Sequence, residues 1–100
     1  MNGAANKLIN HVRLKPATAV VRACAHPLRL KLMAHIHSKR VVNVNSIYRS
    51  LKLEQSVTSQ HLKILRDARL VLAERDGKLV YYKLNYRFLQ KIAGLMDKLF

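Results

Sequence analysis

The sequence predicts a mostly α-helical α+β fold with one two-stranded β-hairpin, and three observations support this prediction. Apolar residues recur at helical spacing in several segments, of which PLRLKLMAHIH is one example. Two β-prone runs, LVLAER and KLVYYKL, flank the turn-forming pair Asp76 and Gly77. Half of the 100 residues are hydrophobic, which is enough to bury one small core, so residues 1–100 are expected to form a single domain.

Two helices are expected before the first β-branched pair. Leu8, Ile9 and Val12 suggest an upstream helix, and residues 17–24 are a candidate extension of it. Pro27 suits the first turn of the second helix, because a backbone N–H at that position would have no partner within the helix. The apolar face of this second helix carries four residues at helical spacing: Leu28, Leu32, His35 and Ile36.

The stretch VVNVNSIYRSLKL predicts a short strand followed by a short helix. The β-branched pair at positions 41 and 42 favours the strand. Asn43 or Asn45 is expected to cap a helix over residues 45–51. Its apolar side chains are Ile47, Tyr48 and Leu51.

The next helix, QSVTSQHLKILRD, follows a tight turn and is expected to begin with Gln55 or Ser56 as its N-cap. With Thr58 at the centre of the buried face, a helical wheel places three residues within about 40° of it: Leu62, Leu65 and Arg69. One flank extends this buried arc with Val57, His61, Ile64 and Ala68. The opposite face carries short or flexible polar groups: Ser56, Ser59, Gln60 and Lys63.

This polar face predicts a surface that reads DNA. Lys and Glu, the usual residues of a solvent face, give way to Ser and Gln on the front turns of the helix. A short helix and a turn precede it, and the N-terminal half of a recognition helix is the part that meets base edges in a major groove. The alternative is an ordinary solvent-facing helix, which is also polar on its outer side.

The Asp76-Gly77 pair is expected to form a type I′ turn, because both residues tolerate positive φ. Arg75, Lys78 and Lys83 surround this turn and predict contacts with the DNA backbone or minor groove. Charge that protects an edge strand is the alternative explanation. A final helix is expected over residues 86–100, with an apolar face made of Phe88, Ile92, Leu95, Met96 and Leu99.

The charge balance favours a polyanionic partner. Nineteen Lys and Arg against five Asp and Glu give a formal net charge of +14, and nucleic acid is the commonest cellular polyanion. A solvated basic surface without a nucleic-acid partner is the alternative. The five acidic residues form no pair, and the sequence has no Gly-rich phosphate loop, so an enzyme is not expected.

Cys24 is the only cysteine, so the chain has no intramolecular disulfide, and the expected location is a reducing cytoplasm. No apolar run approaches the roughly 20 residues that a membrane span requires. A redox role for Cys24 would require an inter-subunit disulfide or a small-molecule adduct, because the chain offers no resolving thiol. A buried small residue is the favoured interpretation.

Three stretches, HPLRLKLMAHI, QSVTSQHLKILRDARLV and ERDGKLVYYKLN, occur in the order and spacing of a known family. Over roughly residues 23–95 the chain resembles the ArsR/SmtB winged helix-turn-helix repressors. The resemblance implies a helix-turn-helix over residues 45–68 and a β-hairpin wing over residues 72–84. It also implies a homodimer in which residues 1–25 and 86–100 form the interface and each protomer reads one half of an inverted repeat.

Two departures from the family pattern have consequences for the site. Where members show a polar residue followed by Val, this chain has Val57 followed by Thr58, so an inward Thr58 needs a backbone partner for its hydroxyl. Metal-sensing members carry thiolates where this chain reads NVNSI, and Asn43 and Asn45 are poor ligands for soft metals. The second family metal site lies on the last helix, where this chain has Tyr86, Phe88 and Leu99.

A histidine metal site is also not expected. His35 and His37 are two residues apart, so on a helix they point in nearly opposite directions and cannot easily share an ion. His35 lies on the apolar stripe and is interpreted as a packed or hydrogen-bonded core residue.

These observations predict a homodimeric, metal-independent transcriptional repressor that binds double-stranded DNA and uses no cofactor. The candidate base and phosphate contacts on the reading helix are Gln55, Ser56, Val57, Ser59, Gln60, His61 and Lys63. Arg75 and Lys78 are candidate backbone contacts from the wing. The candidate interface residues are Leu8, Val12, Phe88, Ile92, Leu95, Met96 and Leu99. A non-specific architectural DNA-binding protein and, less favoured, a protein-interaction module remain as alternatives.

Overall fold

The computed structural model of the chain describes residues 15–99 and confirms the predicted order of elements. Leu8 and Val12 lie outside the described residues, and the side chains of Met96 and Leu99 are also outside that description. The helices and strands are α2 (Lys15–Cys24), α3 (Pro27–Lys39), β1 (Val42–Asn43), α4 (Val44–Leu51), α5 (Gln55–Asp67), β2 (Val71–Asp76), β3 (Leu79–Leu84) and α6 (Tyr86–Leu99).

Local hydrogen bonds stabilise the first turns of α3 and α4. The N-cap of α3 is His26, whose Nδ1 accepts from the backbone N–H of Leu28 at 3.2 Å. Asn43 caps α4, because its Oδ1 accepts from the backbone N–H of Ser46 at 2.8 Å. Lys52 ends α4 in the left-handed region, with φ of 52°.

The predicted N-cap of α5 was wrong. The N-cap is Glu54 and not Gln55 or Ser56, and the Glu54 side chain does not cap the helix. Its backbone oxygen instead accepts two bonds from Thr58, one from the backbone N–H at 3.0 Å and one from Oγ1 at 2.7 Å. The expected backbone partner of the Thr58 hydroxyl is thereby confirmed.

The far end of α5 also differs from the helical wheel. The helix ends at Asp67, so Arg69 does not lie on its buried face. Arg69 is exposed and has φ of 66°, because the chain turns there toward β2. Val57 and Ile64, both expected on the buried flank, are 39% and 40% exposed. Ala68 is buried, as expected.

The β-strands form one antiparallel sheet in the order β1-β3-β2. In the hairpin, Val71 pairs with Leu84 at one end and Asp76 pairs with Leu79 at the other. The short strand β1 joins this hairpin by pairing Val42 with Tyr82. The sheet therefore has one strand more than the predicted hairpin.

The hairpin turn is displaced by one residue from the prediction. Because Asp76 is still paired with Leu79, the two central turn residues are Gly77 and Lys78. φ is 63° at Gly77, and Lys78 does not share a positive φ. This is the pattern of a type II′ turn, which favours glycine at its first central position.

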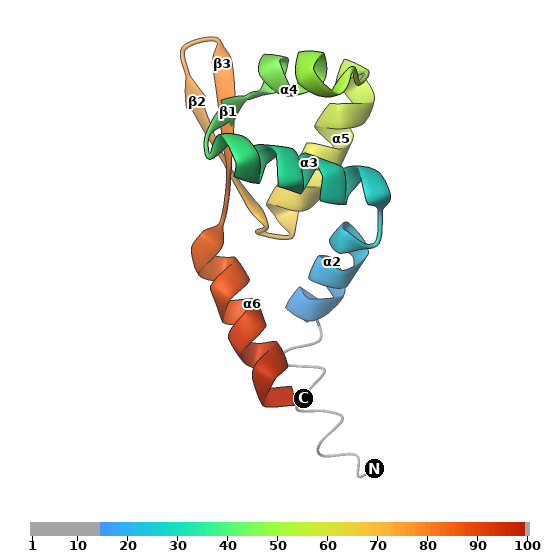
Figure 1. The fold of residues 1–100 in the computed structure, drawn as a ribbon, viewed down its shortest axis with the longest axis vertical. Helices are drawn as coiled ribbons and strands as arrows, with labels where there is room; N and C mark the ends of the chain where they lie inside the picture. Colours follow the sequence, from blue (N-terminus) through green and yellow to red (C-terminus); the bar gives the residue numbers. More distant parts are fainter. Residues whose placement is uncertain (1–14, 100) are drawn as a thin grey trace.

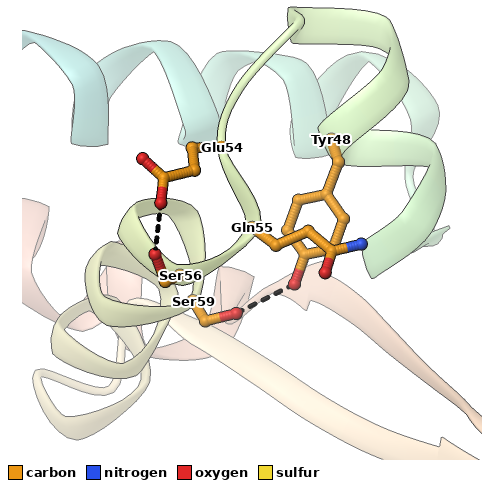
Figure 2. Close-up of a pocket in the computed structure, with 5 residues that line it drawn as sticks. All are labelled: Tyr48, Glu54, Gln55, Ser56 and Ser59. Atoms are coloured by element: carbon orange, nitrogen blue, oxygen red, sulfur yellow. Dashed lines mark hydrogen bonds between the residues drawn. The ribbon is translucent and has the colours of Figure 1, made fainter.

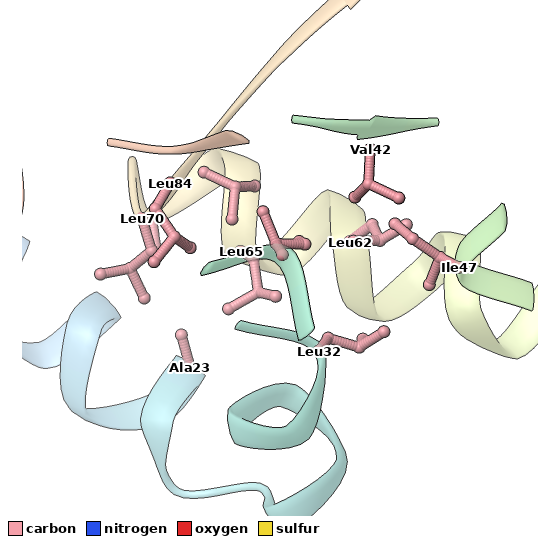
Figure 3. Packing of buried hydrophobic residues seen from close by; sticks show 11 residues of the cluster. Ala23, Leu32, Val42, Ile47, Leu62, Leu65, Leu70 and Leu84 are labelled. Carbon is pink, nitrogen blue, oxygen red and sulfur yellow. The ribbon is translucent and has the colours of Figure 1, made fainter. Parts of the chain in front are cut away.

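The core lies where α3, α5 and the sheet meet (Figure 3). Its largest fully buried apolar side chains come from four helices or strands and one loop: Leu32, Ile36, Ile47, Leu62, Leu65, Leu70 and Val71. Ala23 of α2 closes one side of this cluster, and Val42 and Leu84 close the other. This packing fixes one face of α5 inward and leaves the opposite face free.

The C-terminal helix α6 begins against the core and then leaves it. Asn85 Oδ1 accepts from the backbone N–H of Phe88 at 3.2 Å, which stabilises the first turn. Phe88, Leu89 and Ile92 pack partly buried against the core. Leu95, further along, is 40% exposed. In Figure 1 both α2 and α6 lie toward the end of the molecule opposite to the tip of the hairpin.

Candidate nucleic-acid interface

The helices α4 and α5 form a helix-turn-helix unit. Residues 52–54 connect them, and the backbone N–H of Leu53 donates to the backbone carbonyl oxygen of Tyr48 at 3.0 Å. Ile47 anchors α4 in the core, and Thr58, Leu62 and Leu65 anchor α5. The orientation of α5 is thus fixed by three buried side chains on one face.

Six of the seven predicted contact residues of the reading helix face solvent, on the polar side of α5 and on its flanks. All six are exposed: Gln55, Ser56, Val57, Ser59, Gln60 and Lys63. Val57 is 39% exposed, so this valine presents an apolar group on the same surface. Hydroxyl, amide and ammonium groups with one methyl-bearing side chain are the groups that contact base edges, phosphates and thymine methyls.

The start of α5 borders an open hollow of about 610 Å³, shown in Figure 2. Two hydrogen bonds organise its rim. The Tyr48 hydroxyl and Ser59 Oγ lie 2.8 Å apart, and Ser56 Oγ donates to Glu54 Oε1 at 2.7 Å. Gln55 lines the hollow between these two pairs.

Tyr48 and Glu54 are residues of this surface that the sequence interpretation missed. The sequence predicts Tyr48 on the apolar side of its helix, but its ring is only half-buried and its hydroxyl reaches Ser59. For Glu54, the available sequence signal is its position directly before the reading helix. Both side chains now belong to the candidate interface.

His61, the seventh predicted contact of α5, lies between α5 and the start of α3. Its ring packs against His26 with 4.5 Å between centroids and 52° between the ring planes. Its Nδ1 is buried and has no hydrogen-bond partner within residues 15–99. Burial, followed by the charges of His26 and Arg29, lowers the pKa of His61 below its usual value. This ring therefore supports the helix packing more directly than it offers a contact to DNA.

The wing presents its predicted cations to solvent. Arg75 in β2, Lys78 in the turn and Lys83 in β3 are all exposed. The hairpin tip lies toward the same end of the molecule as α4 and the start of α5, which is the upper part of Figure 1. Cations on a hairpin beside a reading helix are well placed for phosphate contacts.

The positions that carry metal ligands in some ArsR/SmtB repressors have other roles here. The Asn43 amide caps α4. Tyr86, at the start of α6, has its hydroxyl 2.7 Å from His37 Nδ1 and accepts from Arg40 at 3.1 Å. Among the described residues, no group of three or more His, Cys, Asp or Glu side chains is arranged to hold a metal ion.

Two other predicted features can be located. His35 is half-buried, and burial, then the Lys39 charge, lowers its pKa below the usual value. Its Nε2 is buried and has no hydrogen-bond partner among the residues that the structure describes, so at that atom the ring is packed and not bonded to them. Cys24 was expected to be buried, but it is only half-buried against the core.

A helix-turn-helix with an exposed polar reading helix and a basic hairpin defines a winged helix-turn-helix DNA-binding protein. Residues 26–72 match the family described as bacterial regulatory protein, arsR family. The chain is 32% identical to the transcriptional repressor PagR of Bacillus anthracis over 89% of both chains. It is 26% identical to the HTH-type transcriptional regulator YgaV of Escherichia coli, over 84% of this chain and 85% of the relative. The chain therefore belongs to the ArsR family.

Solved structures agree with this assignment. The crystal structure of PagR matches with a TM-score of 0.68, covering 83% of this chain and 94% of that one. HlyU from Vibrio cholerae matches with a TM-score of 0.71 at 26% identity, covering 90% and 97% respectively. The chain is a DNA-binding transcriptional regulator and not an enzyme. None of the helices described is both long and apolar enough to cross a membrane.

Proposed function

We propose that the chain is a homodimeric repressor that binds an inverted-repeat operator and does not require a metal. The observation that carries this proposal is the orientation of α5. Thr58, Leu62 and Leu65 are fully buried, and the polar groups of the front turns face solvent on the other side. Each subunit would insert this exposed face into the major groove of one half-site.

The exposed side chains divide into two roles. Gln60 has an amide that can make two hydrogen bonds to one adenine edge, and the Ser59 hydroxyl can donate or accept. Lys63, Arg75 and Lys78 contact phosphates, which adds affinity that is independent of sequence.

The homodimer is supported by apolar side chains that the subunit leaves uncovered. Val21 of α2 is 66% exposed and Leu95 of α6 is 40% exposed. Phe88 and Ile92, predicted to contact a partner, are partly buried against the subunit's own core, so only their remaining surface is free for a second subunit. Repression is supported by the similarity to PagR, which is named a transcriptional repressor.

Metal independence is supported by the chemistry of the positions involved. The Asn43 amide oxygen already accepts from Ser46, and a neutral amide is a poor ligand for a soft metal. Tyr86 is engaged with His37 and Arg40.

The test is selection of binding sites from a random duplex pool at about 150 mM salt. Wild-type protein should enrich an inverted repeat. The Gln60→Ala variant should lose base preference at one position of each half-site, because the amide reads a base edge. The Lys78→Ala variant should weaken binding to all sequences alike and lower the salt slope by about 1. Lys31→Ala, which removes an exposed lysine of α3, is the matched control and should change neither.

The contrary result is binding at low salt with no enriched motif. A specific regulator should prefer its operator over random DNA by about 10³ or more. A smaller ratio would favour an architectural protein held to DNA by charge, and an absence of duplex binding at low salt would favour a protein-interaction module.

A further inference from the structure

Glu54 occupies a fixed position at the tip of the reading helix. It is the N-cap of α5, and its backbone oxygen is held by two bonds from the fully buried Thr58. Its side chain is exposed and borders the hollow in Figure 2. The carboxylate therefore lies on the surface that is proposed to approach the bases.

Ser56 holds the Glu54 carboxylate in place and uses its only hydroxyl proton to do so. Ser56 Oγ donates its proton to Glu54 Oε1 at 2.7 Å. A serine hydroxyl has one donor proton, so this bond leaves Ser56 with lone pairs only. An ionised carboxylate also accepts only. Glu54 and Ser56 together present an acceptor-only pair to any ligand.

The second hydrogen-bonded pair at this surface has a different character. Either the Tyr48 hydroxyl or Ser59 Oγ can be the donor in their 2.8 Å bond, so the pair keeps one free donor. Gln55 carries both donors and acceptors. The acceptor-only chemistry is thus confined to the Glu54 side of the hollow.

An acceptor-only pair is unfavourable beside most of the DNA surface. Phosphate oxygens are negative, and guanine and thymine present acceptors in the major groove. Adenine presents an amino donor next to the N7 acceptor, whereas the major-groove edge of cytosine offers its N4 amino group as the polar contact. Carboxylates accordingly pair with cytosine in direct readout.

We propose that Glu54, assisted by Ser56, selects a cytosine at one position of each half-site by accepting a hydrogen bond from its N4 amino group. The inference rests on the proposed insertion of α5 into the major groove. The same carboxylate lowers affinity for random DNA, because elsewhere it faces phosphates and acceptor atoms. In a chain with five acidic residues and a net charge of +14, this placement raises the ratio of specific to non-specific binding.

The experiment compares wild type with Glu54→Gln in the same site selection. Glu74→Gln is the matched control, because Glu74 is an exposed acid of the wing and its change removes the same charge. Wild type should enrich cytosine at one position per half-site, and Glu54→Gln should reduce that preference at least about fivefold. Ser56→Ala should weaken the same position. Glu74→Gln should raise affinity for all sequences and leave the motif unchanged.

Direct binding to single-substituted operators completes the test. Replacing that cytosine pair by a thymine pair should weaken wild type at least about fivefold and Glu54→Gln less than about twofold. An inverted repeat that is identical for wild type and Glu54→Gln would overturn the assignment of Glu54 and leave the proposed function intact. No inverted repeat for wild type would overturn both. Circular dichroism of each variant checks that the fold is retained.

Discussion

At the scale of single residues, Thr58 decides which face of α5 meets solvent. It is a fully buried polar residue, and both its backbone N–H and its hydroxyl donate to the backbone carbonyl oxygen of Glu54. A buried hydroxyl without a partner would be destabilising, so this bond makes an inward threonine acceptable. The front turns of α5 can then carry polar groups outward without losing their anchor.

Replacing Thr58 with valine should lower the free energy of unfolding by about 1 kcal/mol. The shape of the side chain is kept, but the 2.7 Å bond from the hydroxyl to the backbone carbonyl oxygen of Glu54 is lost. That carbonyl oxygen keeps its bond from the backbone N–H at position 58. Urea denaturation monitored by circular dichroism measures the change. An equal or higher stability of the variant would show that the hydroxyl contributes nothing to the packing of α5.

His61 should make the protein less stable in acid. Burial, then His26 and Arg29, lowers its pKa in the folded protein below the usual 6.5. The unfolded chain therefore binds a proton at higher pH than the folded chain does. The contribution of the neutral ring to stability is complete above about pH 6.5 and is lost as pH falls through the folded pKa.

Melting temperatures between about pH 8 and pH 5 measure this effect. The wild-type value should fall with acidification, and His61→Gln should show a smaller fall. His35, whose pKa is also lowered by burial and then by Lys39, acts in the same direction, so the variant keeps part of the dependence. If the melting temperatures of the two proteins depend on pH in the same way, His61 does not contribute to the loss of stability in acid.

The sequence predicted most of the exposed face of α5 but not the contacts between elements at this site. Helical periodicity is enough to separate Ser56, Ser59 and Gln60 from Thr58 and Leu62. It cannot show that the start of α3 brings His26 against His61, because that contact depends on the tertiary fold. The bond between Tyr48 and Ser59 was missed for the same reason, since it joins two helices.

At the scale of elements, local residue types determine the helix caps, whereas the pairing of β2 with β3 determines where the hairpin turn lies. Asn43 was correctly one of two candidate caps for α4, because asparagine at this position satisfies a free N–H. The hairpin was predicted from Asp76 and Gly77, but its turn is centred on Gly77 and Lys78 because Asp76 stays in the strand ladder. Local propensity identifies such a hairpin, and cross-strand packing decides its register.

Gly77→Ala should therefore destabilise the wing by about 1–2 kcal/mol. The added Cβ would meet no atom within 4 Å, so the cost arises from φ of 63° and not from a clash. Gly94→Ala is the matched control, because an added Cβ there also meets nothing within 4 Å and the residue lies inside α6. That change should stabilise by roughly 0.5–1 kcal/mol. Urea denaturation of both variants measures the difference, and equal effects would contradict the assigned turn.

At the scale of the whole molecule, the proposed DNA surface and the helices that carry the exposed Val21 and Leu95 lie toward opposite ends. The start of α5 and the wing tip are at one end, and α2 and α6 extend toward the other (Figure 1). This separation allows two subunits to join through α2 and α6 while both reading helices remain free. A two-fold dimer of this kind matches an inverted repeat, because its symmetry places identical helices on the two half-sites.

If α6 forms the proposed dimer interface, Leu95→Glu should weaken association, because a symmetric interface would bury two charges in place of two leucines. The dissociation constant should rise at least about tenfold, in sedimentation equilibrium at several protein concentrations. Leu72→Glu is the matched control, because Leu72 is 42% exposed and Leu95 is 40% exposed, but Leu72 lies on the wing sheet. The control should remain a dimer. Equal dissociation of the two variants would exclude α6 as the interface, and a wild-type monomer at all concentrations would exclude the homodimer itself.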